Sequence, residues 1–302
     1  MSLLPPQICV LERGWLSSNN VLFLEGEQAA LVDSGYVSHA EQTVALVRLA
    51  LAGRRLTRLL NTHSHSDHIG GNAAVQRAFG CTIAIPEGIE EAVTNWDEHA
   101  LLLTSTEQTA EAFAHDATIA SGAEFELGGL LWRALPAPGH DMHALVFHCA
   151  EKRILISGDA LWHDGFGVIF PELSGADGFG PTRATLEMIG ALAIDVVIPG
   201  HGPPFADVDE ALARAFARLA AFEADGTRLG RHAIKVLVTF MLLEKRRLPS
   251  AELPRYLAEA ELARRINDRF LHSTPEALSG WLVAELARAG VVRERDGVLI
   301  AS

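Results

Sequence analysis

The sequence has few cysteines, few basic residues and no long apolar run, and each shortage excludes a class of protein. Its three cysteines, Cys9, Cys81 and Cys149, are widely spaced and odd in number, so they form neither a disulfide framework nor a Cys-x-x-Cys metal site. No apolar run approaches the ~18 residues of a membrane-spanning helix. Residues 1–7 lack a basic stretch followed by an apolar one. We therefore expect a soluble protein of the reducing cytoplasm, without a membrane partner.

Acidic residues outnumber basic ones by 38 to 25, which gives a formal net charge of −13. Nonspecific affinity for nucleic acids comes largely from Lys and Arg residues that displace counterions, so this balance disfavours a nucleic-acid partner. A local basic patch, or bound metal ions, could still engage a phosphate. Hydrophobic residues make up 49% of a chain without repeats or low-complexity tracts, which indicates an ordinary globular protein of one large or two unequal domains.

Four short apolar runs are each followed by a turn that carries a His or an Asp residue. The runs cover residues 56–61, 131–136, 153–157 and 195–199, and they precede His63, His140, Asp159 and His201. Each run is typical of a buried strand, so each turn is predicted at the carboxyl end of a strand. Apolar spacing also predicts a hairpin over residues 21–33 and helices over residues 39–52, 70–79, 98–115 and 182–192.

The sequence pattern changes after about Phe205, where several long segments with the apolar spacing of helices follow one another. Residues 291–302 then form two short β-prone pieces around Asp296-Gly297, a strong hairpin signal. Helices that end in a hairpin are typical of a winged-helix arrangement. We therefore predict one domain over residues 1–205 and a mainly helical, winged-helix-like domain over residues 206–302.

The densest motif covers residues 62–68, Thr-His-Ser-His-Ser-Asp-His. In an extended segment alternate side chains share a face, so His63 and His65 can bind one ion, while Asp67 and His68 can address a second ion beside it. Imidazole and carboxylate ligands without a thiolate suit zinc, iron or manganese. Packing alone is a poor explanation for this cluster, because each buried side chain would need its own hydrogen-bond partner.

The motif resembles the HxHxDH hallmark of the metallo-β-lactamase superfamily, and three later motifs match in the same order. These are Pro138-Gly139-His140, Gly158-Asp159 and Pro199-Gly200-His201. The resemblance implies an α/β fold, the αββα sandwich, for residues 1–205. It also implies two divalent metal ions, zinc by default with iron or manganese as alternatives. One ion would be held by His63, His65 and His140, the other by Asp67, His68 and His201, with Asp159 between them.

The same resemblance implies a metal-dependent hydrolase. Two adjacent cations lower the pKa of a shared water, so the attacking species would be a metal-bound hydroxide, which Asp67 would orient. Asp33, in Val32-Asp33-Ser34-Gly35, matches a superfamily position that usually supports a metal ligand, although turn formation explains it equally well. His143, three residues after His140, could likewise support a ligand or serve only the fold.

The metal motif and the helical C-terminal region are most similar to glyoxalase II and related thioesterases. Residues 162–170 lie where glyoxalase II contacts glutathione, but the expected Lys and Tyr contacts are not evident there. Trp162, Phe166 and Phe170 could instead line an apolar acyl-binding pocket, or simply pack in the core. The leading hypothesis is hydrolysis of a thioester or related acyl ester of a small molecule.

Two other classes of function stay open at this point. Beta-lactamase-like endoribonucleases also join this catalytic domain to a winged-helix-like module, so the chain could cleave phosphodiesters. Iron-dependent oxygen chemistry, or a regulator that uses its C-terminal domain for partners, is the third possibility. The C-terminal helices could cap the active site, form a homodimer or bind a partner, and amphipathicity does not separate these roles.

Overall fold

The computed structural model describes residues 3–301 of the chain. They form two compact units. The first contains the chain up to residue 103 together with residues 109–219, and the second contains residues 104–108 and the chain from residue 220 onward. Among residues 3–301, no helix has both the length and the apolar composition that crossing a membrane requires.

The first unit contains two β-sheets. The six-stranded sheet has the order β1-β2-β3-β4-β5-β6. Its first three strands are antiparallel neighbours, and from β3 onward the neighbours are parallel. The strands are β1 (Ile8–Leu11), β2 (Asn20–Glu25), β3 (Gln28–Val32), β4 (Arg55–Leu60), β5 (Thr82–Pro86) and β6 (Ala117–Ile119).

The five-stranded sheet has the order β11-β10-β9-β8-β7. All its neighbours are antiparallel except the pair β10 and β11, which is parallel. The strands are β7 (Glu124–Leu127), β8 (Leu130–Pro136), β9 (Leu145–Cys149), β10 (Ile154–Gly158) and β11 (Val196–Pro199). Because β10 and β11 are parallel, the residues that follow them emerge at the same edge of the sheet.

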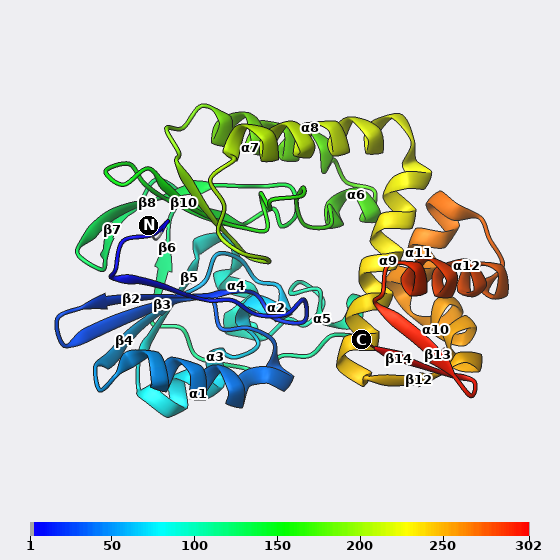
Figure 1. Cartoon of the computed structure of the whole chain (residues 1–302), viewed down its shortest axis with the longest axis horizontal. Helices are drawn as coiled ribbons and strands as arrows, with labels where there is room; N and C mark the ends of the chain where they lie inside the picture. Colours follow the sequence, from blue (N-terminus) through cyan, green and yellow to red (C-terminus); the bar gives the residue numbers. More distant parts are fainter. Residues whose placement is uncertain (1–2, 302) are drawn as a thin grey trace. The chain divides into compact units, whose positions relative to one another are not determined.

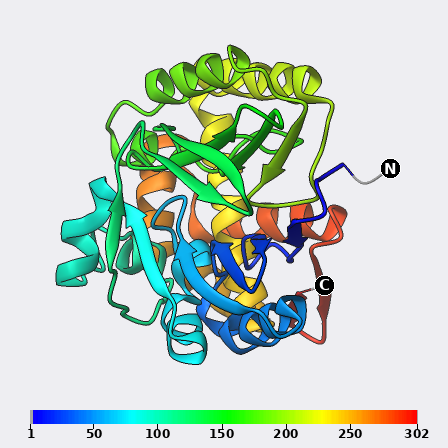
Figure 2. The same cartoon turned by 90° about the vertical axis from the view of Figure 1, so that its left-hand side faces the viewer.

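The two faces of the six-stranded sheet bury different residues. Val21 and Phe23 of β2 join a core shared with the five-stranded sheet, while Leu22 joins a second core with helices. This alternation follows from the pleat of a strand. Helices α1 (Ala40–Leu51) and α3 (Asn72–Phe79) supply that second core. Helix α7 (Phe179–Gly190) and the first part of α8 (Val208–Ala224) lie beyond the other sheet (Figures 1 and 2). The layers are therefore α, β, β, α, which confirms the predicted sandwich.

The second unit has the order helix, strand, helices, strand, strand. Its elements are α9 (Gly226–Lys245), β12 (Arg247–Pro249), α10 (Leu253–Glu259), α11 (Glu261–Ile266), α12 (Pro275–Arg288), β13 (Val292–Arg295) and β14 (Val298–Ala301). The strands form an antiparallel sheet in the order β12-β14-β13. Asp296 and Gly297 have φ values of 52° and 72°, as a tight hairpin turn requires. This order agrees with the predicted winged-helix-like arrangement.

The helix predicted over residues 98–115 is wrong. Only the short α5 (Leu103–Thr106) forms there. Leu102 and Glu107, on either side of it, have φ values of 59° and 55°, which no right-handed helix accommodates. Leu101 and Phe113 are nevertheless buried in the helix-facing core. The apolar residues of this segment therefore bury individual side chains of an irregular chain and do not form one face of a helix.

The two compact units divide within α8, later in the chain than the predicted boundary at residues 205 and 206. Ala211, Leu212 and Ala215 on the first part of this helix are buried. Arg214 donates to the carbonyl of His163 and to Asp207 at 2.8 and 3.0 Å. These contacts join the start of α8 to the first unit. The limits of independently folding domains stay a prediction.

Candidate metal centre

The seven predicted ligands lie together where strands of the two sheets end. They form two groups: His63, His65 and His140 in one, and Asp67, His68, Asp159 and His201 in the other. Within each group one ligand atom per residue lies within 4.8 Å of all the others. The fold therefore brings all seven predicted ligands together, and their role as ligands stays a prediction.

The first group consists of imidazoles held by local hydrogen bonds. Nδ1 of His65 and Nε2 of His140 lie 2.6 Å apart. Nδ1 of His140 donates to the carbonyl of Val168 at 2.5 Å, which leaves Nε2 for the centre. Nδ1 of His63 lies 3.0 Å from the hydroxyl of Thr62. Each of these contacts limits the rotation of an imidazole ring, so the donors are held in place by the protein.

The second group is organised around His68. Nδ1 of His68 donates to Oδ2 of Asp33 at 2.8 Å. The other oxygen of Asp33 accepts from the backbone amide of Thr62 at 2.9 Å, and Oδ2 also accepts from the Thr62 hydroxyl at 2.8 Å. Asp33 is thus fixed by three hydrogen bonds, and it turns Nε2 of His68 toward the centre. Asp33 also has a φ of 59°, so it forms the turn as well.

The carboxylate of Asp159 contacts both groups. Its oxygens lie 3.4 Å from Nε2 of His68 and 3.3 Å from Nε2 of His140. A third imidazole, that of His201, lies 3.8 Å from Oδ2 of Asp159 and 3.0 Å from Oδ2 of Asp67. The carboxylate of Asp159 therefore lies within reach of both groups of candidate ligands.

Two buried ring nitrogens test whether a metal fits this cluster. Nε2 of His63 and Nε2 of His68 have no hydrogen-bond partner among the described residues, although the Nδ1 atom of each ring has one. Burying a polar atom without a partner is costly, and native structures rarely do so. A bound cation would satisfy both nitrogens, so the residues present fit a metal centre.

The electrostatics of the two groups differ. Burial lowers the pKa of His63 well below its ordinary value and that of His65 to about 4. Burial also acts to lower the pKa of His68, but the carboxylates of Asp33 and Asp159 outweigh it and raise that pKa well above its ordinary value. Burial acts to raise the pKa of Asp159, yet His68 and the other imidazoles lower it well below its ordinary range. A cation would take the place of the proton on His68, because metal ligation requires a neutral imidazole.

A buried polar segment before β2 holds the loop that carries His201. The side-chain amide of Asn19 donates to the carbonyls of Pro199 and Gly202 at 3.0 and 2.7 Å, and its backbone amide donates to Gly200 at 2.7 Å. The sequence prediction missed Asn19. Its only sequence signal is the polar run Ser17-Ser18-Asn19-Asn20, which resembles an exposed turn but is almost fully buried.

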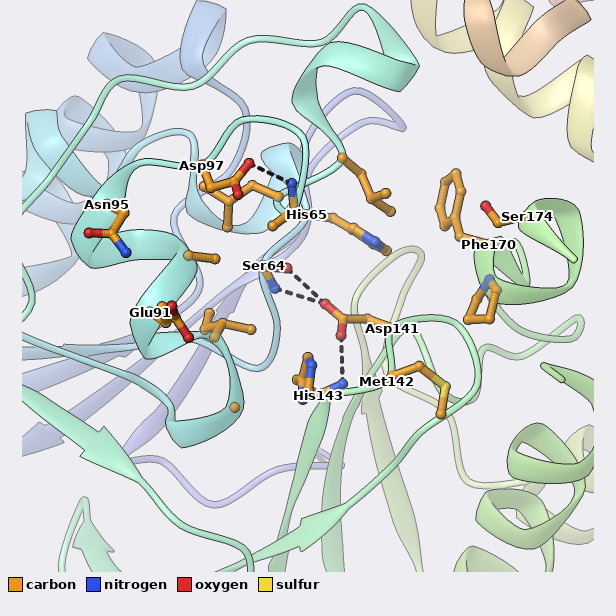
Figure 3. A pocket seen from close by; sticks show the side chains of 17 residues that line it. Ser64, His65, Glu91, Asn95, Asp97, Asp141, Met142, His143, Phe170 and Ser174 are labelled. Atoms are coloured by element: carbon orange, nitrogen blue, oxygen red, sulfur yellow. Dashed lines mark hydrogen bonds between the residues drawn. The ribbon is translucent and has the colours of Figure 1, made fainter. Parts of the chain in front are cut away.

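Asp141 joins two of the ligand loops and was also missed. One carboxylate oxygen accepts from the hydroxyl and the backbone amide of Ser64 at 2.9 and 3.3 Å, and the other accepts from the backbone amide of His143 at 2.7 Å (Figure 3). Asp141 thereby connects the loop of His63 and His65 to the loop of His140. His143, which the sequence offered as a supporting residue, lies on the wall of a pocket and outside both ligand groups.

The aromatic residues singled out in the sequence have different places. Trp162 donates its indole N–H to Oδ1 of Asp159 at 3.1 Å and packs edge-on to His201. Phe170 packs against His65 with ring centroids 4.9 Å apart. Phe166 is only 1% exposed, so it is a core residue. The sequence prediction missed Trp15. This residue is 59% exposed, and its indole stacks on the imidazole of His201 with ring centroids 5.3 Å apart.

A pocket of about 470 Å³ opens beside His65. Its walls come from α4 (Glu90–Asn95) and the loop after it, the turn of residues 141–143, and the start of α6 (Phe170–Ser174) (Figure 3). Phe170 lines this pocket and packs against His65 of the first ligand group. A small molecule bound here would lie beside His65 of the first ligand group.

Comparison with known proteins identifies the family. The family model of the metallo-beta-lactamase superfamily matches residues 13–201, which include all seven candidate ligands. A hydroxyacylglutathione hydrolase of Anaeromyxobacter dehalogenans is 30% identical over 71% of this chain and 76% of that protein. One from Methylococcus capsulatus is 32% identical over 45% of this chain and 47% of that protein. Further hydroxyacylglutathione hydrolases align over 38% to 52% of their length, so the chain spans about half the length of most of these relatives.

Solved structures show the same fold. A metallo-beta-lactamase family protein from Thermus thermophilus matches over 100% of both chains, with a TM-score of 0.61 and 18% identity. The B3 metallo-beta-lactamase BLEG-1 matches over 68% of this chain and 96% of its own, with a TM-score of 0.55 and 22% identity. Given the family model, the sandwich fold and the two groups of His and Asp side chains, this chain belongs to the metallo-β-lactamase superfamily.

Proposed function

We propose that the protein is a dinuclear metal hydrolase that cleaves a thioester or a related acyl ester. The observation that carries this proposal is the position of Asp159 between two complete groups of ligand side chains. The hydroxyacylglutathione hydrolases among its relatives favour acyl transfer to water. In this reaction the carbonyl–sulfur or carbonyl–oxygen bond breaks, water supplies the new oxygen of the carboxylic acid, and the leaving thiol or alcohol gains a proton.

The two ions would be held by the side chains already grouped by the fold. His63, His65 and His140 would hold one, Asp67, His68 and His201 the other, and Asp159 both. Zinc is the default, and the mixture of imidazole and carboxylate also suits iron or manganese. When bound, such ions polarise a carbonyl group and make a water molecule more acidic.

The protein's own residues would position the reactants. Asp67 lies in the second group, and an ionised carboxylate can accept a hydrogen bond and so orient the attacking water. Asp33 keeps the His68 ring in one orientation. Trp15 and Trp162 flank His201 and would exclude bulk water from that side of the centre, and Phe170 does the same beside His65.

Removal of the metal ions is expected to abolish hydrolysis and to destabilise the fold. Chelation would leave Nε2 of His63 and Nε2 of His68 without a partner, at a cost of about 1–3 kcal/mol each. We would assay a panel of acyl-CoA, acyl-glutathione and simple thioester substrates before and after chelation, and record thermal unfolding of the same samples. Readdition of zinc should restore both properties. The proposal fails if the metal-loaded protein turns over none of the panel.

Replacement of Asp33 by Asn is expected to weaken metal binding and turnover by about 10- to 100-fold, the usual effect of losing a carboxylate that orients a ligand imidazole. Asn accepts the left-handed backbone of this position, so the turn should survive. Zinc titration and kcat/KM would measure the effect. Asp116→Asn is the matched control, because Asp116 also accepts a backbone N–H, from Ile83 at 2.8 Å, but lies outside both ligand groups. Equal effects of the two changes would contradict the role of Asp33.

Phosphodiester cleavage is the second candidate, and one observation favours it. Residues 220–302 contain 13 of the 25 Lys and Arg residues and the winged-helix-like order of elements. Residues 1–219 carry the remaining 12 basic residues against 27 acidic ones, which would repel a phosphate backbone around the centre. Incubation with single-stranded RNA, with Asp67→Ala as the control, separates this candidate from acyl hydrolysis.

A further inference from the structure

The basic residues that line the pocket beside His65 are the two histidines, His65 and His143. Among the described residues that line it there is no Lys or Arg, whereas three are carboxylates, Glu91, Asp97 and Asp141 (Figure 3). A pocket that bound a carboxylate- or phosphate-bearing molecule would be expected to supply guanidinium or ammonium groups. The carboxylates of this lining would instead attract a cationic group.

Two of the three carboxylates accept hydrogen bonds from other residues of the protein. Asp141 is buried, and one of its oxygens accepts a hydrogen bond from Ser64 while the other accepts one from His143. Asp97 accepts from the backbone amides of His99 and Ala100, both at 3.0 Å, through one oxygen. Their negative charges still face the pocket, because hydrogen bonds to neutral groups leave the charge in place.

Glu91 is the carboxylate left for a ligand. It lies on the first turn of α4, is exposed, and makes no hydrogen bond or ion pair with the residues that the structure describes. Its neighbour Glu90 does not line the pocket and instead lies 3.7 Å from Nε2 of His115. Glu90 therefore offers a matched control with the same charge on the same turn.

His65 places this pocket beside the candidate metal centre. His65 is 7% exposed and lines the pocket, and its Nε2 has no hydrogen-bond partner among the described residues. Apolar side chains also line the pocket, and they include Ile89, Leu101, Met142 and Phe170. A ligand in this pocket would therefore find the imidazole of His65, apolar surface and the carboxylate of Glu91 within one cavity.

We propose that this pocket binds the non-reacting end of the substrate and selects cationic groups over uncharged ones, and uncharged groups over carboxylates and phosphates. This inference rests on the proposed acyl hydrolase function and narrows its substrate class. Opposite charges in contact near a protein surface attract one another, so a contact with Glu91 is expected to discriminate measurably between cationic and anionic groups. With this selection, the protein would act poorly on thioesters whose non-reacting end is anionic.

Matched thioesters test the selection. One series carries a trimethylammonium, tert-butyl or carboxylate group on the leaving thiol, and a second series carries the same groups at the end of the acyl chain. In at least one series we expect kcat/KM to fall about tenfold from the cationic to the anionic member at low salt. The ratio should shrink in 0.5 M NaCl, where screening extends over only a few ångströms. Glu91→Gln should reduce the ratio severalfold, and Glu90→Gln should leave it unchanged.

Binding of the corresponding non-hydrolysable thioethers to the zinc-loaded protein is the second measurement. The same order of affinity is expected by calorimetry, with the same response to Glu91→Gln. Equal binding of cationic and anionic thioethers, or preference for the anionic one, overturns the inference whether or not turnover is seen. Charge-selective binding without hydrolysis of any thioester would instead overturn the proposed function and leave the selection standing.

Discussion

Replacement of Asp159 by Asn is expected to reduce thioester hydrolysis by more than about a hundredfold, since loss of a residue that only supports a ligand already costs about 10- to 100-fold. At least one metal ion per chain should be lost as well. The carboxylate lies within 3.4 Å of imidazoles from both groups of candidate ligands, so its charge would act on both of the proposed ions. The amide of Asn keeps the shape but neither the charge nor the second acceptor oxygen. Metal content by plasma mass spectrometry and kcat/KM on one preparation would measure both effects.

Asp195→Asn is the control for this substitution. Asp195 precedes β11 and pairs with Arg153 on the surface at 2.8 Å, with 59% of its side chain exposed. A surface pair of this kind contributes about 0–1 kcal/mol, so activity and metal content should stay near those of the unmodified protein. If Asp159→Asn retained two ions and most of its activity, the shared role of Asp159 would be wrong.

Replacement of Gly200 by Ala is expected to inactivate the enzyme while costing about 1–3 kcal/mol of stability, the usual effect of forcing an extra methyl group into a packed interior. A Cβ at this position would lie 2.1 Å from Oδ1 of Asp159 and 3.0 Å from Cε1 of His68. The backbone cannot yield easily, because Gly200 donates to the carbonyl of Gly158 and accepts from the amide of Asn19, both at 2.7 Å. The methyl group would therefore displace the Asp159 carboxylate.

Gly280→Ala separates this steric effect from the general effect of replacing glycine. Gly280 lies in α12, and a Cβ there would meet nothing within 4 Å. Ala in a helix interior should stabilise the protein by about 0.5–1 kcal/mol and leave hydrolysis unchanged. Denaturant unfolding and kcat/KM would be measured for both variants. Normal metal content and activity in Gly200→Ala would show that the loop can move aside, contrary to its hydrogen bonding.

Much of the fold could be predicted because short-range patterns coincide with burial. Val21 and Phe23 alternate with Leu22 in the sequence, and these residues bury on opposite faces of β2. Thr274 precedes α12 and accepts from the amide of Ala277 at 3.3 Å, as a helix cap should. The segment of residues 98–115 could not be predicted this way. Its apolar residues anchor an irregular path whose left-handed turns at Leu102 and Glu107 leave no periodic signal.

The candidate ligands were predictable for a different reason. Four of them lie within residues 63–68, where a local sequence pattern fixes their proximity. The other three follow buried strands, and the carboxyl ends of such strands meet at one edge of the sandwich. Asn19, Asp141 and Trp15 carry no such pattern. Each acts on a loop that is distant in sequence, so only the folded chain shows what it holds.

By itself the sequence determined the layered fold and the family and indicated the seven candidate ligands, because alternation, strand-end turns and the spacing of histidines are local properties. The tertiary structure decided how these side chains are held and what lies beside them. The hydrogen bonds of Asp33 to His68 and of Asp141 to Ser64 are long-range contacts, and Glu91 and His65 come to line one pocket. They arise only when separate loops are packed against one another, since hydrogen bonds and charge act over a few ångströms in space whatever the distance along the chain.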